Sequence, residues 1–236
     1  MRVFAIADPH LSKAEPKPMT IFGENWAGHP EAFFERWRES VCADDLVLIP
    51  GDISWAMRLE GALEDLRDIA ALPGKKVLLR GNHDYWWPSI SKLRRALPKG
   101  MYAVQNDALR FENVVVAGTR GWVTPGSTDF TEQDEKVYQR ELERLKLSLE
   151  SAKKLSDETT KTPMKTVVML HYPPTNLKLE PSGFTDLLLE YAPDALVFGH
   201  LHGSTRVIET LGEIQVHFVA ADALSFKPRL VLEALR

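Results

Sequence analysis

Short hydrophobic stretches alternate with amphipathic segments along the first hundred residues of the chain. Each hydrophobic stretch ends within two residues at a glycine, proline or aspartate, which is typical of a buried β-strand. Three stretches are predicted as strands: 3–7, 45–49 and 76–79. In the segments that follow them, apolar side chains recur every three or four residues, which is the period of a helix. Three segments are predicted as helices: 31–41, 59–72 and 89–97. This alternation indicates a parallel sheet with right-handed crossovers.

The second half of the chain is richer in predicted strands. The strands are 101–104, 109–111, 114–118, 167–170, 195–198 and 229–233. The first three are expected to form hairpin pieces, and a short helix is predicted at 185–191. A further hairpin is predicted from 204–210 and 213–219, which flank Leu211-Gly212. Polar residues at 13–30 and 156–165 indicate surface loops.

The segment 131–156 has a different rhythm from the rest of the chain. Its apolar side chains step by four and three residues: Tyr138, Leu142, Leu145, Leu149 and Ala152. The other positions are mostly charged, so the pattern predicts a long amphipathic helix with one apolar stripe. The stripe has two interpretations. It packs on the domain, or it forms a seam with a second copy of the chain in a homo-oligomer.

Composition and charge narrow the class of protein. The chain has 236 residues, of which 44% are hydrophobic and 26% charged, so we expect one globular domain over 1–236. The net charge of −4 gives no overall basic footprint for nucleic acid, although a local patch is not excluded. The single cysteine, Cys42, fits a reducing compartment, and we expect a cytoplasmic location. The opening apolar run is too short for a signal peptide or a membrane span, so no membrane association is expected.

Polar side chains follow five of the predicted strands directly. The clusters are Asp8-Pro9-His10, Gly51-Asp52, Gly81-Asn82-His83-Asp84, His171 and Gly199-His200-Leu201-His202. Because the carboxyl ends of parallel strands meet at one edge of a sheet, clusters that are distant in sequence are expected to converge there.

The chemistry of these clusters points to metal ions. In extended backbone, residues i and i+2 point to the same side, so Asp8 with His10, and His200 with His202, can each direct two ligands at one place. Carboxylate, imidazole and amide donors together suit Mn, Fe, Zn or Co better than a lone Mg or Ca site. Seven donor side chains exceed the needs of one tetrahedral site, so two divalent ions are expected. Neutral histidine ligands imply that metal binding weakens below about pH 6.5.

Each cluster taken alone has an ordinary structural explanation. Asp8 and Asp52 are common turn residues, and Asn82 or Asp84 suits the cap of the following helix. His171 is compatible with a hydrogen-bonded core histidine. The metal interpretation depends on the whole series, because all five clusters occur at strand exits in one chain.

The series resembles the calcineurin-like metallophosphoesterases from residue 8 to residue 202. The resemblance implies a four-layer α/β/β/α sandwich of two mixed β-sheets flanked by helices. It implies one metal held by Asp8, His10, Asp52 and His202, and a second held by Asn82, His171, His200 and a bridging Asp52. It also implies that His83 is the catalytic histidine and that Asp84 orients it. In many members an acid stands where this chain has Trp55, which puts the substrate class in question.

The expected function is therefore a metal-dependent phosphohydrolase with manganese as the first choice of metal. A metal-bridging hydroxide would attack a small phosphate-ester substrate while His83 assists the leaving group. The alternatives are a phosphodiesterase or nuclease acting on nucleotides or nucleic acid, and a non-catalytic scaffold with this fold. Trp55 and Trp86 are candidate stacking residues, or they simply pack the loops. Arg80 and Arg120 are candidate clamps for a second anionic group, or ordinary surface arginines.

Overall fold

Two mixed β-sheets pack face to face in the computed structural model, which describes residues 1–128, 130–157, 163–203 and 205–233. The first sheet has five strands in the order β11-β1-β2-β3-β4. Their bounds are Arg229–Glu233, Arg2–Ala5, Leu46–Pro50, Lys75–Leu79 and Met101–Ala103. Strands β1 to β4 are parallel, and β11 is antiparallel to β1. The last strand of the chain thus closes the sheet beside the first.

The second sheet has six strands in the order β5-β6-β7-β8-β10-β9. Their bounds are Ala108–Phe111, Val114–Thr119, Lys165–Leu170, Ala195–Phe198, Ile214–Phe218 and Thr210–Leu211. The four central strands are parallel, and each edge strand is antiparallel to its neighbour.

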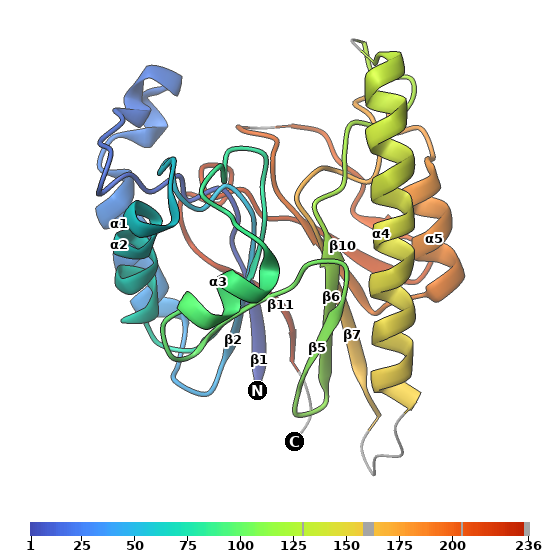
Figure 1. Ribbon diagram of the computed structural model, residues 1–236, viewed down its shortest axis with the longest axis horizontal. Helices are drawn as coiled ribbons and strands as arrows, with labels where there is room; N and C mark the ends of the chain where they lie inside the picture. The colour runs from blue at the N-terminus through green and yellow to red at the C-terminus, as the bar shows by residue number, and fades with distance from the viewer. Residues whose placement is uncertain (129, 158–162, 204, 234–236) are drawn as a thin grey trace.

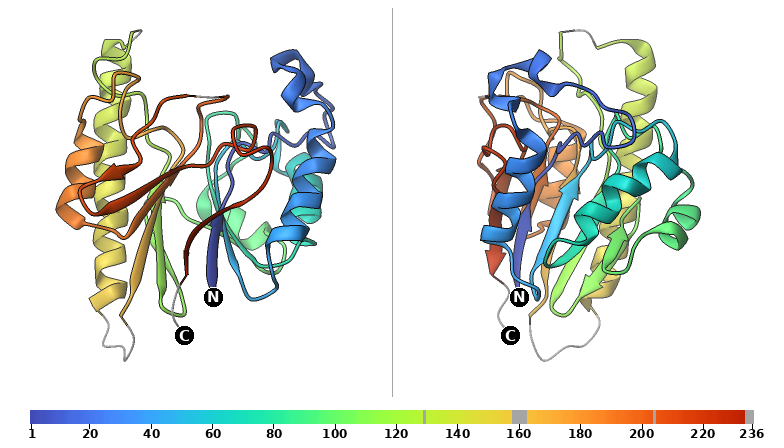
Figure 2. Two further views of the ribbon diagram at one scale, coloured as in Figure 1. Left: turned by 180° about the vertical axis from the view of Figure 1, so that it is seen from behind. Right: turned by 90° about the vertical axis from the view of Figure 1, so that its left-hand side faces the viewer.

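Helices cover the outer face of each sheet and complete four layers (Figure 1). On the first sheet lie α1 (His29–Ser40), α2 (Leu59–Ala70) and α3 (Ile90–Ala96). On the second lie α4 (Glu132–Asp157) and α5 (Gly183–Tyr191). Figure 2 shows the same layers from behind and from the side. The α/β/β/α arrangement that the resemblance implies is therefore confirmed.

The strands are hydrophobic on both faces because both faces are buried. In β2, Val47 and Ile49 pack under the helices, while Leu46 and Leu48 pack between the sheets. In β6, Val115 faces α4 and α5, and its neighbour Val116 faces the other sheet. Continuous apolar runs are the pattern expected for such strands, since successive side chains alternate between two cores.

The long helix α4 buries its apolar stripe against its own domain. Tyr138, Leu145, Leu149 and Ala152 are buried against the second sheet and α5, and Leu142 is half-buried beside them. This is the first of the two interpretations of the stripe. Among the residues that the structure describes, no helix is both long enough and apolar enough to cross a membrane.

Three expectations about the elements need correction. Strands β1 to β4 are parallel as predicted, but β4 pairs with β3 while β5 starts the second sheet. Only β5 and β6 therefore form the predicted hairpin. The strand expected at 204–210 shrinks to β9, Thr210–Leu211, and residue 204 lies outside the described residues. The 13–30 loop contains two short 3₁₀ helices, Met19–Phe22 and Glu24–Trp26, which bury Met19 and Trp26. The loop expected at 156–165 falls mainly on residues 158–162, outside the described residues.

Candidate metal centre

The polar clusters lie together at the end of the sandwich where the parallel strands finish. Strands β1, β2 and β3 of the first sheet lead into the clusters at residues 8, 52 and 82. Strands β7 and β8 of the second sheet lead into His171 and His200. Two sheets thus contribute to one site. This is the convergence that the sequence predicts, although it expected a single edge.

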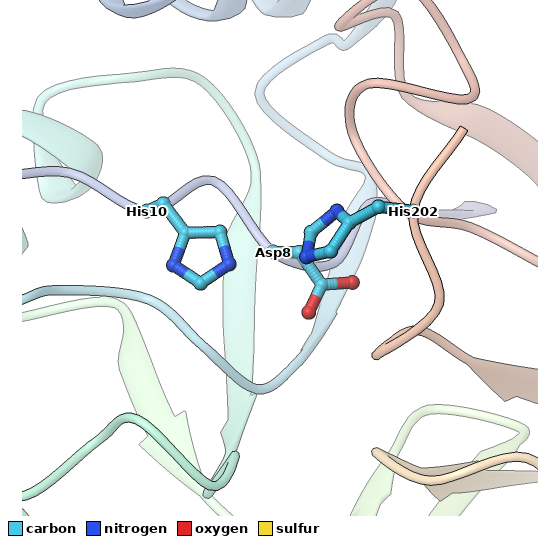
Figure 3. A group of neighbouring side chains, drawn as sticks. All are labelled: Asp8, His10 and His202. Carbon is cyan, nitrogen blue, oxygen red and sulfur yellow. The ribbon is translucent and has the colours of Figure 1, made fainter. Parts of the chain in front are cut away.

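Three of the predicted ligands form what we call the outer group: Asp8, His10 and His202. Each contributes one ligand atom, and these atoms all lie within 4.8 Å of one another. Figure 3 shows the Asp8 carboxylate close to the His202 ring, with the His10 ring beside them. Asp8 is fully buried, and Oδ2 accepts the backbone N–H of His200 at 2.9 Å. The other oxygen, Oδ1, has no hydrogen-bond partner among the described atoms. A buried carboxylate oxygen that receives no hydrogen bond is suited to bind a cation.

Four further predicted ligands form the inner group: Asp52, Asn82, His171 and His200. The Oδ1 atom of Asn82 lies 2.7 Å from His171 Nε2 and 2.9 Å from His200 Nδ1. Oδ2 of Asp52 lies 3.5 Å from His171 Nε2 and 3.8 Å from His10 Nε2, so it stands between the two groups. Asp8 also reaches both groups, because it clusters with Asp52 and His171 as well.

The inner group presents acceptor atoms to one another. His171 Nδ1 lies 2.9 Å from the carbonyl oxygen of Pro50, which only accepts, so Nδ1 carries the proton. In the neutral ring, Nε2 then directs a lone pair at the oxygens of Asn82 and Asp52. Three acceptors turned toward one point are stabilised by a cation, and the mixed N and O set suits a transition metal. The residues present therefore fit a metal site.

Burial sets the protonation of these groups. It lowers the pKa of His171 and of His200 to about 3 and lowers that of His10 well below its usual value. Burial, followed by the Asp52 charge, raises the pKa of Asp8 well above its usual value, and burial raises that of Asp52 to about 6. The imidazoles are neutral near pH 7, and the carboxylates lack a protein cation. A bound divalent cation would accept the lone pairs of the neutral imidazoles and offset the negative charge of the carboxylates.

The backbone is strained where the ligands sit. Asp8, His10, Asp52 and His200 all adopt the left-handed conformation, with φ of 56°, 45°, 51° and 69°. Such conformations cost energy in residues other than glycine and concentrate at functional sites. At Gly199 a Cβ would run into the carboxylate of Asp8, so glycine is required for the close approach of these two strand ends.

Asp84 does not orient His83, contrary to the expectation. Its carboxylate accepts the backbone N–H groups of Gly81 at 2.8 Å, Asp52 at 2.9 Å and Ile53 at 2.9 Å. It therefore ties the turn after β2 to the turn after β3. His83 Nδ1 is buried and makes no hydrogen bond within the described part of the chain. Its Nδ1 proton thus has no carboxylate to fix it.

Trp55 packs on the site histidines instead of forming a free stacking wall. It is 9% exposed, and its ring stacks on that of His10 at 4.8 Å between centroids. The His83 ring lies 4.6 Å from it. The backbone N–H of Trp55 donates to Leu11, and the indole N–H contacts the sulfur of Met19 at 3.2 Å. Trp55 is thus held in place between the two loops that carry His10 and His83.

The other proposed substrate residues are Trp86, Arg80 and Arg120. Trp86 is buried, and its indole N–H donates to Asp84 at 3.0 Å, so it is a packing residue and not a stacking surface. The Arg120 guanidinium lies 4.5 Å from the Trp122 ring centre and 3.7 Å from Glu141. The Nε atoms of Arg80 and Arg120 are buried without a hydrogen-bond partner in the described structure. A clamping role for these arginines stays a prediction.

Sequence reasoning missed Asp222. Its Oδ1 lies 3.1 Å from His202 Nδ1, and its Oδ2 accepts the N–H of Gly203 at 2.7 Å. A carboxylate at Nδ1 leaves Nε2 of His202 free for a metal, as is usual for histidine ligands. The sequence contains a pattern that could have identified Asp222, because this residue follows the apolar run Val219-Ala220-Ala221 just as Asp8 follows its strand. Pro50 was missed because its contribution is a backbone carbonyl.

Two clefts open beside the ligands. Cleft A, of about 360 Å³, is lined by His10, Met19, Phe22, Asn25, Trp26, Trp55, His83, His202, Gly203 and Asp222. Cleft B, of about 370 Å³, is lined by parts of 123–128 and 172–178, together with Phe130, Asp134, His200 and Leu201. Cleft A therefore borders the outer group and His83, whereas cleft B borders the inner group.

Two solved structures are similar to this chain in fold. A crystal structure of phosphopantetheinyl hydrolase (PptH) from Mycobacterium tuberculosis is similar over 93% of this chain and 88% of that one, with a TM-score of 0.51 and 14% identity. The protein of unknown function AQ665 from Aquifex aeolicus is similar over 98% of this chain and 95% of that one, with a TM-score of 0.48 and 15% identity. No curated protein matches in sequence.

The family model described as calcineurin-like phosphoesterase matches residues 1–204. This range includes every predicted metal ligand and both β-sheet edges that carry them. Thus the chain belongs to the calcineurin-like phosphoesterase family and is a phosphoester hydrolase.

Proposed function

We propose that the protein hydrolyses small phosphate esters with two divalent cations, manganese being the first choice. The observation that carries the proposal is the pair of ligand groups joined by Asp8 and Asp52, with His83 beside them in a cleft. When bound, the cations supply positive charge for the phosphoryl oxygens and lower the pKa of water so that it becomes a nucleophile near neutral pH.

The electrostatics of the protein groups explain the need for cations. Asp8 and Asp52 bring two carboxylates together in a buried site, and burial lowers the pKa of His10, His171 and His200 so that these imidazoles are neutral. Such a site repels a phosphate dianion. Asp8, His10, Asp52 and His202 would hold one cation, and Asn82, His171 and His200 would hold the other with Asp52.

His83 is placed to assist the leaving group. Its ring lies 5.8 Å from that of His10 and lines cleft A. No carboxylate of the described residues binds its Nδ1. His83 would donate a proton or a hydrogen bond to the departing oxygen. Trp55 limits the orientations of the ring by packing against it.

We also propose a location and a mode of assembly for the protein. A cytoplasmic location is supported by the lone, unpaired Cys42. A homo-oligomer through α4 would use the charged outer face of that helix, because the apolar stripe is buried within the domain. The expected partner at the site is the phosphate-ester substrate itself.

The test is a metal screen on purified protein. The chelator-treated protein is given Mn²⁺, Zn²⁺, Co²⁺ or Mg²⁺ in turn and assayed with an aryl phosphomonoester and an aryl phosphodiester. We expect activity with Mn²⁺ that is absent from the chelated protein. Cleavage of single-stranded DNA with neither aryl ester hydrolysed would replace the proposal with a nuclease, and inertness toward all substrates with every metal would contradict it.

A further inference from the structure

Cleft B is a preformed space beside the inner ligand group to which the proposed reaction gives no role. It reaches the ligands through His200, whose ring lies 4.0 Å from that of Tyr172. Cleft A reaches them from the other group through His10 and His202. A phosphoryl group bound at the ligands would therefore lie near both clefts.

Apolar side chains supply most of the exposed surface of cleft B, and polar residues that include Asp134 and Lys178 complete its lining. The apolar residues include Val123, Tyr172, Pro173, Leu177 and Leu201. Leu177 is 70% exposed, so its side chain contributes apolar surface that a ligand would cover. Pockets for small molecules have this composition, with few polar groups placed to fix the ligand.

Thr124 supplies such a polar group. It lines the cleft, is 2% exposed, and its Oγ1 makes no hydrogen bond to any atom that the structure describes. A buried hydroxyl without a partner costs free energy, which a hydrogen-bonding atom of a ligand would recover.

The cleft keeps its shape without a ligand. The buried Asn176 donates from Nδ2 to the carbonyl oxygen of Pro125 at 3.1 Å, which joins the two loops that form the walls. Its Oδ1 accepts the backbone N–H of Lys178 at 3.0 Å. Little ordering is then required on binding, so contacts in the cleft contribute directly to affinity.

We propose that the substrate is a phosphodiester whose retained substituent, an apolar group with one hydrogen-bonding atom, occupies cleft B. The inference rests on the proposed function. His83 lines cleft A, so the departing alcohol lies there, and the substituent that stays on phosphorus lies on the other side. A monoester has one substituent and would leave cleft B without an occupant.

The reaction is a simple hydrolysis in this arrangement. A bond forms between phosphorus and the oxygen of water, and the bond between phosphorus and the alcohol oxygen in cleft A breaks. One proton of the water ends on that alcohol. The products are a phosphomonoester anion, held by its substituent in cleft B, and a free alcohol.

Two substrates with one leaving group test the inference. Wild-type protein loaded with Mn²⁺ is assayed with bis(4-nitrophenyl) phosphate and with 4-nitrophenyl phosphate. We expect kcat/KM for the diester to exceed that for the monoester by about tenfold or more, because the retained ring adds binding energy remote from the reaction.

Paired variants locate the effect in cleft B. Thr124→Val removes the hydroxyl and should lower the ratio of diester to monoester kcat/KM by about threefold to tenfold. Leu177→Gln changes an exposed side chain, so folding is not at risk, and should lower the same ratio by about threefold. The matched controls are Thr210→Val, at an exposed position of β9, and Leu189→Gln, at an exposed position of α5. Both should keep the wild-type ratio.

A binding measurement gives a readout independent of turnover. Phenylphosphonate and methylphosphonate are titrated calorimetrically onto the manganese-loaded proteins. We expect the phenyl compound to bind more tightly to wild type, and Leu177→Gln to reduce that preference about threefold while Leu189→Gln leaves it unchanged.

The outcomes separate the two proposals. Hydrolysis of both esters with no change of ratio in either cleft variant overturns the inference and leaves the proposed function standing. A wild-type preference for the monoester does the same. Hydrolysis of neither ester with any metal overturns the proposed function and the inference with it.

Discussion

The inner and outer ligand groups share Asp8 and Asp52 but differ in how firmly the protein holds them. His171 of the inner group is fully buried, and its Nδ1 is fixed by the Pro50 carbonyl inside the sandwich. The side chain of His202 in the outer group is 42% exposed and depends on Asp222 for its orientation. One group is built into the junction of the two sheets, while the other is completed by a loop at the surface.

This difference has a consequence for metal binding. A ligand whose rotamer is already fixed loses little entropy when it binds, so the inner group should bind its cation more tightly. The outer group should lose its cation first to a chelator. Trp55 and His83 line cleft A beside the outer group.

The largest effect that tests the comparison comes from two adjacent residues. His83→Ala should spare both metals and reduce turnover by roughly 10²–10⁴-fold, because it removes only assistance to the leaving group. Asn82→Ala should reduce the metal content of the inner group, because it removes an oxygen 2.7 Å from His171. Elemental analysis of both variants beside steady-state kinetics checks this. Equal loss of metal in the two variants would show that His83 is a ligand.

A change at Asp222 should affect the outer group alone. Asp222→Asn removes the carboxylate beside His202 Nδ1 and should weaken the outer cation by about 10- to 100-fold. Calorimetric titration with Mn²⁺ should then show one site near wild-type affinity and one weakened site. Asp186→Asn, on α5 away from the centre, is the matched control. Equal weakening of both sites would mean that the two groups form one unit.

Substitution of Trp55, which lies beside the outer group, should have a smaller effect on turnover. Trp55→Ala removes the ring 4.6 Å from His83, and we expect kcat to fall about tenfold because the imidazole is less well oriented. Trp55→Phe keeps an aromatic ring and should recover most of that loss. The metal content should not change. A rise in KM with unchanged kcat would instead place Trp55 in substrate binding.

The sequence predicted the fold class and the position of the polar clusters at strand ends, but not which strands pair. The ligands could be located because each polar residue directly follows an apolar run, and strand ends are easy to recognise. The pairing of the strands could not be predicted, because β4 and β5 are similar in sequence pattern yet belong to different sheets. Pairing depends on which core each strand face meets, and periodicity alone does not contain that information.

The roles of neighbouring groups were the least predictable part of the site. Asp84 is next to His83 in the chain, yet its side chain accepts four backbone N–H groups from the turns after β2 and β3. Asp222 is 20 residues from His202 and contacts it directly. Hydrogen bonding of this kind follows from the tertiary arrangement of the turns, so adjacency in sequence is a poor guide to it.

The smallest predicted effect concerns pH and identifies which ligands compete with protons for the metal. Burial lowers the pKa of His171 and His200 to about 3, so these histidines are already neutral throughout the range where the sequence expected them to titrate near 6.5. Burial raises the pKa of Asp52 to about 6, and a carboxylate must lose its proton to bind a cation. Burial also raises the pKa of Asp8, so below pH 6 protons compete with the cation at both carboxylates, and Mn²⁺ affinity should be at least about fourfold weaker at pH 5.5 than at neutral pH. Calorimetric titrations at pH 7.5, 6.5 and 5.5 in two buffers of different ionisation enthalpy give both the affinity and the number of protons released.

Because Asp52 lies between the two groups, both sites should weaken together, in contrast to the Asp222 variant. A loss confined to the outer site would show that Asp52 is not the group at which protons compete.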